Sequence, residues 1–150
     1  MSTYTCQQLQ QEIGSSISLI PYDNDTKAHI KRPNGASLAL IDFEQGRIEA
    51  RLTVTWNKMA LAGLPGRKPD AATIASARQE LREEVLYDWD LAGFTIPDEG
   101  KLEQIPDPDH KNRKTMAYVV VATKSVPTRS DAAQALQAID KFCNWITIKA

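Results

Sequence analysis

The sequence predicts an α+β fold, one domain in which two main helices pack on a mixed or antiparallel sheet. Three observations predict it. Two alternating segments, 36–43 and 47–56, flank a glycine turn and are typical of an antiparallel hairpin. Helical patterns begin at Asp70 and near Ser130, each with a residue type that caps a helix. The apolar run 116–122 has the composition of a central, fully buried strand.

The elements of the first half follow from periodicity and turn residues. Residues 4–14 are expected to form a short amphipathic helix, with Leu9 and Ile13 four apart. A strand is expected from residue 17 to Pro21, and Asp23-Asn-Asp25 is typical of a turn rather than a calcium loop. The weakly alternating segment 27–32 and the hairpin follow, and the second hairpin strand places these residues on one side: Ile48, Ala50, Leu52, Val54 and Trp56.

The second half opens with a segment rich in Gly and Pro, 62–69, which we expect to be a loop. Asp70 then caps a helix that runs to about Tyr87 or Trp89. The remaining expectations are a strand over 91–96, a polar loop over 105–114, the strand 116–122, a helix from Ser130 and a closing strand over 145–148.

Composition narrows the class of protein. The 150 residues suit a single domain, and 42% hydrophobic with 25% charged residues is ordinary for a folded chain. A net charge of −1 argues against a large nucleic-acid surface. No run approaches the roughly 20 apolar residues of a membrane span, and no secretion signal is evident, so we expect a cytoplasmic protein. Cys6 and Cys143 are expected to be free thiols.

An acidic patch is the strongest candidate for chemistry. Glu80, Glu83 and Glu84 are three and four residues apart, so they share one face of the expected helix. Magnesium prefers hard oxygen ligands and is held by a few carboxylates together with substrate phosphates. The same spacing is also typical of an ordinary solvated face, because Glu and Arg are good helix formers. Both interpretations remain open at this point.

The order of motifs resembles the Nudix hydrolases. In that family a hairpin leads into a Pro-Gly-Gly loop and a helix that carries Arg-Glu-aliphatic-any-Glu-Glu; here the matching segments are 64–68 (LPGRK) and 79–84 (QELREE). The resemblance covers about residues 36–123. It implies an α/β/α sandwich and magnesium-dependent hydrolysis of a nucleoside-diphosphate derivative. Glu80, Glu83 and Glu84 would hold the metal, with Glu83 and Glu84 in catalysis.

The chain departs from the family pattern at several positions. Arg67 replaces the second loop glycine, Gln79 the arginine, and Leu86 a later glycine, while Ala71 or Ala72 stands where a glutamate is expected. By residue type, Arg51, Trp56 and Arg67 are candidates for binding a nucleotide-like substrate, with Lys111, Arg113 and Lys114 available in a loop. The leading hypothesis is a divergent Nudix-like hydrolase that uses magnesium. The departures suit an alternative of another class, a non-catalytic binding, inhibitory or immunity-type accessory protein that docks a protein partner through an exposed face.

Overall fold

The computed structural model of the protein describes residues 4–32, 37–107, 110 and 112–149. In chain order the elements are α1 (Cys6–Ile13), β1 (Ser18–Tyr22), β2 (Lys27–Lys31), β3 (Ser37–Asp42), β4 (Arg47–Trp56), α2 (Lys58–Ala62), η1 (Pro65–Arg67), α3 (Ala71–Leu81), η2 (Arg82–Leu86), α4 (Tyr87–Leu91), β5 (Lys101–Pro106), β6 (Lys114–Ser125), α5 (Arg129–Lys141) and β7 (Trp145–Ile148).

The strands form one mixed sheet. Its order is β1-β2-β3-β4-β6-β5, antiparallel throughout, and β7 pairs with β4 in parallel. On the same side of β4, β3 pairs with residues 47–50 and β7 with residues 53–56. These pairings confirm the α+β class and the predicted hairpin. They do not confirm the α/β/α sandwich that the resemblance implies.

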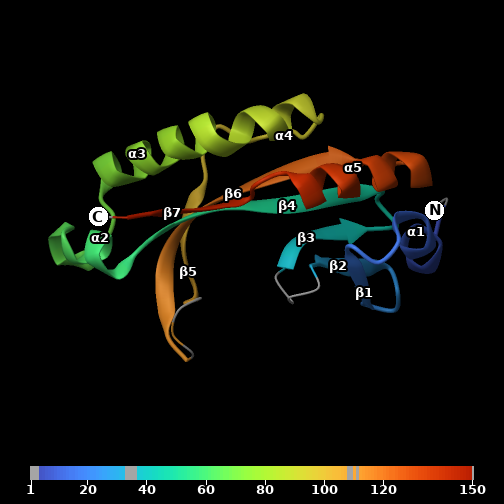
Figure 1. The fold of residues 1–150 in the computed structure, drawn as a ribbon, viewed down its shortest axis with the longest axis horizontal. Coiled ribbons are helices and arrows are strands. Elements are labelled where there is room, and N and C mark those ends of the chain that lie inside the picture. Colours follow the sequence, from blue (N-terminus) through green and yellow to red (C-terminus); the bar gives the residue numbers. More distant parts are fainter. Residues whose placement is uncertain (1–3, 33–36, 108–109, 111, 150) are drawn as a thin grey trace.

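Strand β4 organises the core. Its alternate residues from Ile48 to Trp56 face inward, as predicted, and all five are buried. The helices α3, α4 and α5 lie on one side of β4, β6 and β7 (Figure 1). The buried side chains of sheet and helices belong to a single hydrophobic cluster. Removal of this apolar surface from water is the main stabilising contribution to the fold.

One long helical rod crosses the sheet from residue 71 to 91, and it contains a π-turn. Asp70 caps it as predicted, because its carboxylate accepts a hydrogen bond from the Thr73 N–H at 2.8 Å. The π-turn, η2, inserts extra residues into the helical repeat. As a result the neighbouring Val85 and Leu86 are both buried, and Trp89 reaches the core, where its ring contacts Phe94.

Three predicted elements differ from the structure, and one helix was not predicted. Strand β1 continues through Pro21, which an edge strand tolerates because its outer N–H groups need no ladder partner. The helix includes Leu91, so the strand expected over 91–96 is reduced to one bridge between Thr95 and Thr123. The start of the expected loop over 105–114 belongs instead to β5, whose pairing with β6 outweighs its polar composition. Residues 58–62 form α2, an element that sequence reasoning missed.

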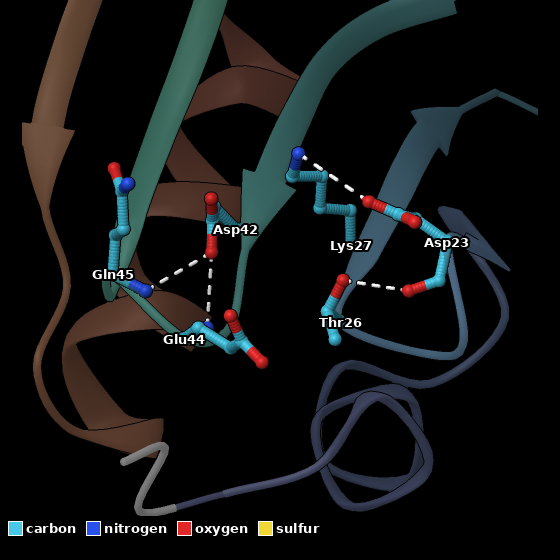
Figure 2. A network of polar contacts seen from close by, with 6 residues as sticks. All are labelled: Asp23, Thr26, Lys27, Asp42, Glu44 and Gln45. Carbon is cyan, nitrogen blue, oxygen red and sulfur yellow. Dashed lines mark hydrogen bonds and ion pairs between the residues drawn. The ribbon is translucent and has the colours of Figure 1, made fainter.

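Two turns at the β1–β3 end fix the hairpins (Figure 2). The Asp42 carboxylate accepts hydrogen bonds from the Glu44 and Gln45 N–H groups, both at 3.0 Å. In the other turn Thr26 donates its hydroxyl to the Asp23 carbonyl oxygen at 2.7 Å. Asp23 also pairs with Lys27. Side chains that bond their own backbone in this way fix tight turns, as the sequence predicted for 23–25.

Candidate binding groove

A surface groove lies where α2, the first turns of α3 and the ends of β4 and β7 meet. Its volume is about 430 Å³, within the range of roughly 300–1,000 Å³ that ligand pockets occupy. Apolar surface dominates its lining, and Met59 on its wall is 73% exposed. The lining residues are Trp56, Met59, Ala60, Gly63, Leu64, Ala72, Thr73, Ser76 and Ile148.

Local sequence explains how the wall on the α2 side is built. Asn57 ends β4 and caps α2, with its side-chain oxygen accepting from the Ala60 N–H at 2.8 Å. The chain then turns through η1, where Gly66 and Arg67 both have positive φ, 62° and 57°. Glycine adopts this conformation freely, whereas a residue with a Cβ is strained in it by about 1–2 kcal/mol. Arg67 is therefore held in a backbone conformation that its side chain disfavours.

Four cations adjoin the lining residues along the chain. Lys58 precedes Met59, Arg67 and Lys68 follow Leu64 within four residues, and Lys149 follows Ile148. All four side chains are exposed, and none forms an ion pair with a described residue. This end of the groove therefore carries uncompensated positive charge.

Asp70 is the one acid between residues 57 and 76, and it is already engaged. Its carboxylate accepts from both the Thr73 hydroxyl, at 2.7 Å, and the Thr73 N–H. These hydrogen bonds favour the ionised form and lower the pKa of the Asp70 carboxyl from its ordinary value. Asp70 thus stabilises the start of α3 and stays ionised, so its single negative charge offsets one of the four cations and leaves a positive excess.

The predicted glutamates lie further along the helical rod. Glu80 is in α3, one turn beyond Ser76, while Glu83 and Glu84 are in η2, and all three are exposed. Glu83 accepts a hydrogen bond from the Gln79 side-chain amide at 2.8 Å, within the helix itself. Across the described residues, no group of three or more His, Cys, Asp or Glu side chains could hold a metal ion.

The three predicted substrate-binding residues occupy two places. Trp56 lines the groove, and Arg67 lies in η1, three positions after the lining residue Leu64. Arg51 lies away from the groove. It is in β4 and forms an ion pair with Glu103 of β5, on the sheet face opposite the alternate core residues of β4. Arg113 and Lys114 lie at the start of β6, and Lys111 is outside the described residues.

Sequence reasoning missed two parts of this site. It took the whole 62–69 segment as a loop and did not see that Lys58–Ala62 forms a helix that walls the groove. The available signal was Asn57, a good N-cap residue that precedes Lys58-Met-Ala-Leu, a run of good helix formers. It also did not connect Lys149 with Arg67, because they are 82 positions apart, the difference between their numbers.

A second cavity, of about 700 Å³, lies between α1 and β1. Gln10 lines it, and its side-chain amide already bonds Gly14, Ile17 and Leu19 of the same region. This cavity adjoins residue 4, where the described chain begins. We therefore assign no ligand to it.

The two cysteines are free, as predicted; Cys6 is half-buried and Cys143 exposed. In the described part of the chain, no helix is both long enough and apolar enough to cross a membrane. Comparison with known proteins finds no matching family model, no similar curated protein and no similar solved structure. The resemblance to the Nudix hydrolases thus stays a prediction from the motif at residues 64–84.

Proposed function

We propose that the protein is a non-catalytic binding protein that docks a protein partner, and that the groove between α2, α3 and β7 receives a segment of that partner. The observation that carries this proposal is the apolar groove beside four exposed, unpaired cations, Lys58, Arg67, Lys68 and Lys149. Such a site favours a ligand with an apolar body and a negatively charged end.

Each part of the site contributes a different property to binding. Burial of a partner's apolar side chain against Met59 and Trp56 removes exposed hydrophobic surface from water. The cations add attraction at a distance, which raises the association rate and discriminates against basic partners. Glu80 lies one turn beyond the lining residue Ser76 along α3, so we expect the acidic end of a bound segment to point away from it, toward the cations.

The test is a library of short peptides in which leucines alternate with other residues and two aspartates stand at one end. Binding is measured by calorimetry and by tryptophan emission, to which Trp56 contributes. We expect Ser76→Trp, which fills the groove, to weaken binding at least tenfold. Ala75→Trp is the matched control, since Ala75 is also exposed on α3 but does not line the groove.

Charge reversal provides an independent check. The double variant Arg67→Glu, Lys68→Glu is expected to abolish binding of the aspartate peptides and to improve binding of peptides with lysines in their place. Arg113→Glu, Lys114→Glu makes the same change in net charge at the β6 end that points away from the helices, and should leave binding unchanged (Figure 1). Equal binding of aspartate and lysine peptides, or no binding at all, would overturn the proposal.

Hydrolysis remains the alternative that the motif predicts, and it has a direct test. On the present proposal, magnesium or manganese with nucleoside diphosphate sugars, dinucleotides and nucleoside triphosphates gives no turnover. Metal-dependent turnover that disappears in Glu83→Gln and Glu84→Gln, with both variants folded as judged by circular dichroism, would establish the enzyme instead.

A further inference from the structure

The edge of β7 that faces away from β4 has unpaired backbone groups at Thr147, while the Trp145 carbonyl oxygen on the same edge accepts a hydrogen bond from the Cys143 thiol at 3.1 Å. The Asn144 and Ile148 carbonyl oxygens accept from the Thr53 and Asn57 N–H groups of the β4 side, at 2.8 and 2.9 Å. Because successive residues of a strand direct their backbone groups to opposite edges, the N–H and C=O of Thr147 face outward. Thr147 is exposed, and no described residue bonds these groups.

The other two sheet edges are protected. Along β1, Pro21 lacks an N–H, and the Gln10 amide bonds the Leu19 N–H at 2.7 Å and the Ile17 carbonyl at 2.9 Å. Along β5, the sequence carries Lys101, Glu103 and Pro106. Strand β7 has neither proline nor charge in its four residues, WITI. Proteins protect sheet edges with proline, charge or short strand length, and β7 has only the short length, so the backbone groups of Thr147 are open to pairing.

The open edge and the groove share a residue. Ile148 belongs to β7 and also lines the groove, and Lys149 follows it directly. A strand added beside β7 would therefore reach the groove at its Ile148 end, with alternate side chains directed to the helix-covered face of the sheet. Backbone pairing would supply affinity, and the apolar groove and nearby cations would supply specificity.

We propose that an extended segment of the partner, with apolar residues at alternate positions and acidic residues at one end, pairs with β7 as an additional strand. This inference rests on the proposed function and adds the binding mode and the chemistry of the segment. The charge complementarity is with Lys149, Arg67, Lys68 and Lys58, which adjoin the C-terminal end of β7 and the groove.

A second copy of the chain fits these charges less well. In an antiparallel pairing of β7 with itself, Lys149 of one copy comes opposite residues 143–145 of the other, Cys-Asn-Trp, which carry no acid. The cations would then remain uncompensated. An acidic segment from another protein would neutralise these cations, and we therefore infer that such a segment, not a second copy of the chain, pairs with β7.

The experiment uses backbone N-methylation of the best aspartate peptide, which leaves the protein unchanged. Alternate amides are methylated in two sets, one on each edge of the peptide strand. We expect the set that faces β7 to lose at least tenfold in affinity and the other set, the matched control, to bind normally. Hydrogen exchange of the Thr147 amide should slow on binding of the unmodified peptide.

The outcomes separate this inference from the proposed function. If the peptide binds in the groove but both methylated sets bind equally and the Thr147 amide stays unprotected, the pairing inference is wrong while the proposed function stands. If no peptide binds, the proposed function itself fails. A dimer in sedimentation experiments, with Thr147 protected in the protein alone, would show that a second copy takes the edge and would overturn the inference.

Discussion

The two halves of β4 lie in different surroundings along the same edge. Residues 47–50 pair with β3, which is followed outward by β2 and β1, and α1 closes the outermost strand. Along this edge, residues 53–56 pair with the four residues of β7, and no described strand pairs with the outer edge of β7. On the opposite edge, β6 pairs with both halves of β4. The structure thus combines a closed half, in which every strand is covered, with an open half whose last strand presents its edge. On the proposed function, the partner binds at the open half.

Truncation of an inward-facing side chain should show the largest difference in stability between the two halves. Ile41 in β3 is fully buried, so Ile41→Ala is expected to lower the free energy of unfolding by about 2–5 kcal/mol. Ile146 in β7 is only half-buried, and Ile146→Ala should cost roughly 1 kcal/mol. Urea unfolding of both variants measures the difference. Equal losses would show that β7 is as firmly packed as β3.

The next largest effect is expected from loss of the Gln10 hydrogen bonds that protect the β1 edge. Gln10→Ala removes three hydrogen bonds from the Gln10 side chain and leaves the Leu19 N–H and Ile17 carbonyl without that partner. The expected cost is about 1–3 kcal/mol in urea unfolding, with faster hydrogen exchange at the Leu19 amide. The replacement Gln11→Ala, at an exposed neighbour in α1, serves as control. Unchanged exchange at Leu19 would contradict the assigned role of Gln10.

In the open half, a substitution that relieves backbone strain at Arg67 should raise stability and lower affinity for the partner. Arg67→Gly places glycine at φ 57° and is expected to raise the free energy of unfolding by up to about 1 kcal/mol. It also removes one of the four cations, so affinity for aspartate peptides should fall. Arg67→Lys retains both the charge and the strain and should do neither. A stability gain in Arg67→Lys would show that the strain is not the cause.

The smallest effects concern pH, and they have opposite directions in the two halves. In the closed half, burial and then the nearby Asp131 raise the pKa of Tyr4 from 10.0 to about 12. Tyr4 therefore contributes stability that is complete below pH 10 and is lost as pH rises toward 12. Thermal unfolding of Tyr4→Phe should show a shallower alkaline decline, and an identical slope would contradict this origin.

In the open half the linkage lies at acid pH. The hydrogen bonds from Thr73 lower the pKa of Asp70 from its ordinary 3.8, so its contribution is present above that pH and is lost as pH falls through the lowered value. Asp70→Asn retains a capping oxygen without the titration. We expect a slightly flatter acid limb in its melting curve. The same acid limb as in the unmodified protein would indicate that other carboxyls account for it.

The sequence predicted the elements whose signals are local and missed those that depend on partners. The hairpin and the Asp70 cap follow from alternation and a capping side chain, and both were confirmed. Strand β5 carries a polar and proline-containing sequence, and only its pairing with β6 makes it a strand. The rotation that η2 introduces has no periodic signature, so the facing of Leu86 could not be predicted.

The same limit applies to the candidate site. Trp56 and Arg67 were chosen by residue type; Trp56 lines the groove, and Arg67 lies three positions after the lining residue Leu64. The glutamates were chosen by spacing, which fixes a shared helix face but not what lies opposite that face. Long-range juxtapositions such as that of Ile148 with Leu64 depend on the sheet topology and carry no local signal.

The parallel pairing of β7 with β4 also has a kinetic consequence. Thr147 meets Thr55 at a separation of 92 positions in sequence, a loop whose closure costs chain entropy before any contact compensates for it. We expect β7 to add after the folding transition state, with φ-values near zero for substitutions at Ile146 and Ile148 and higher values in the β3–β4 hairpin. A strand that joins last is also the one that detaches most readily. Strand β7 would then detach from β4 and pair with it again while the remainder of the domain stays folded.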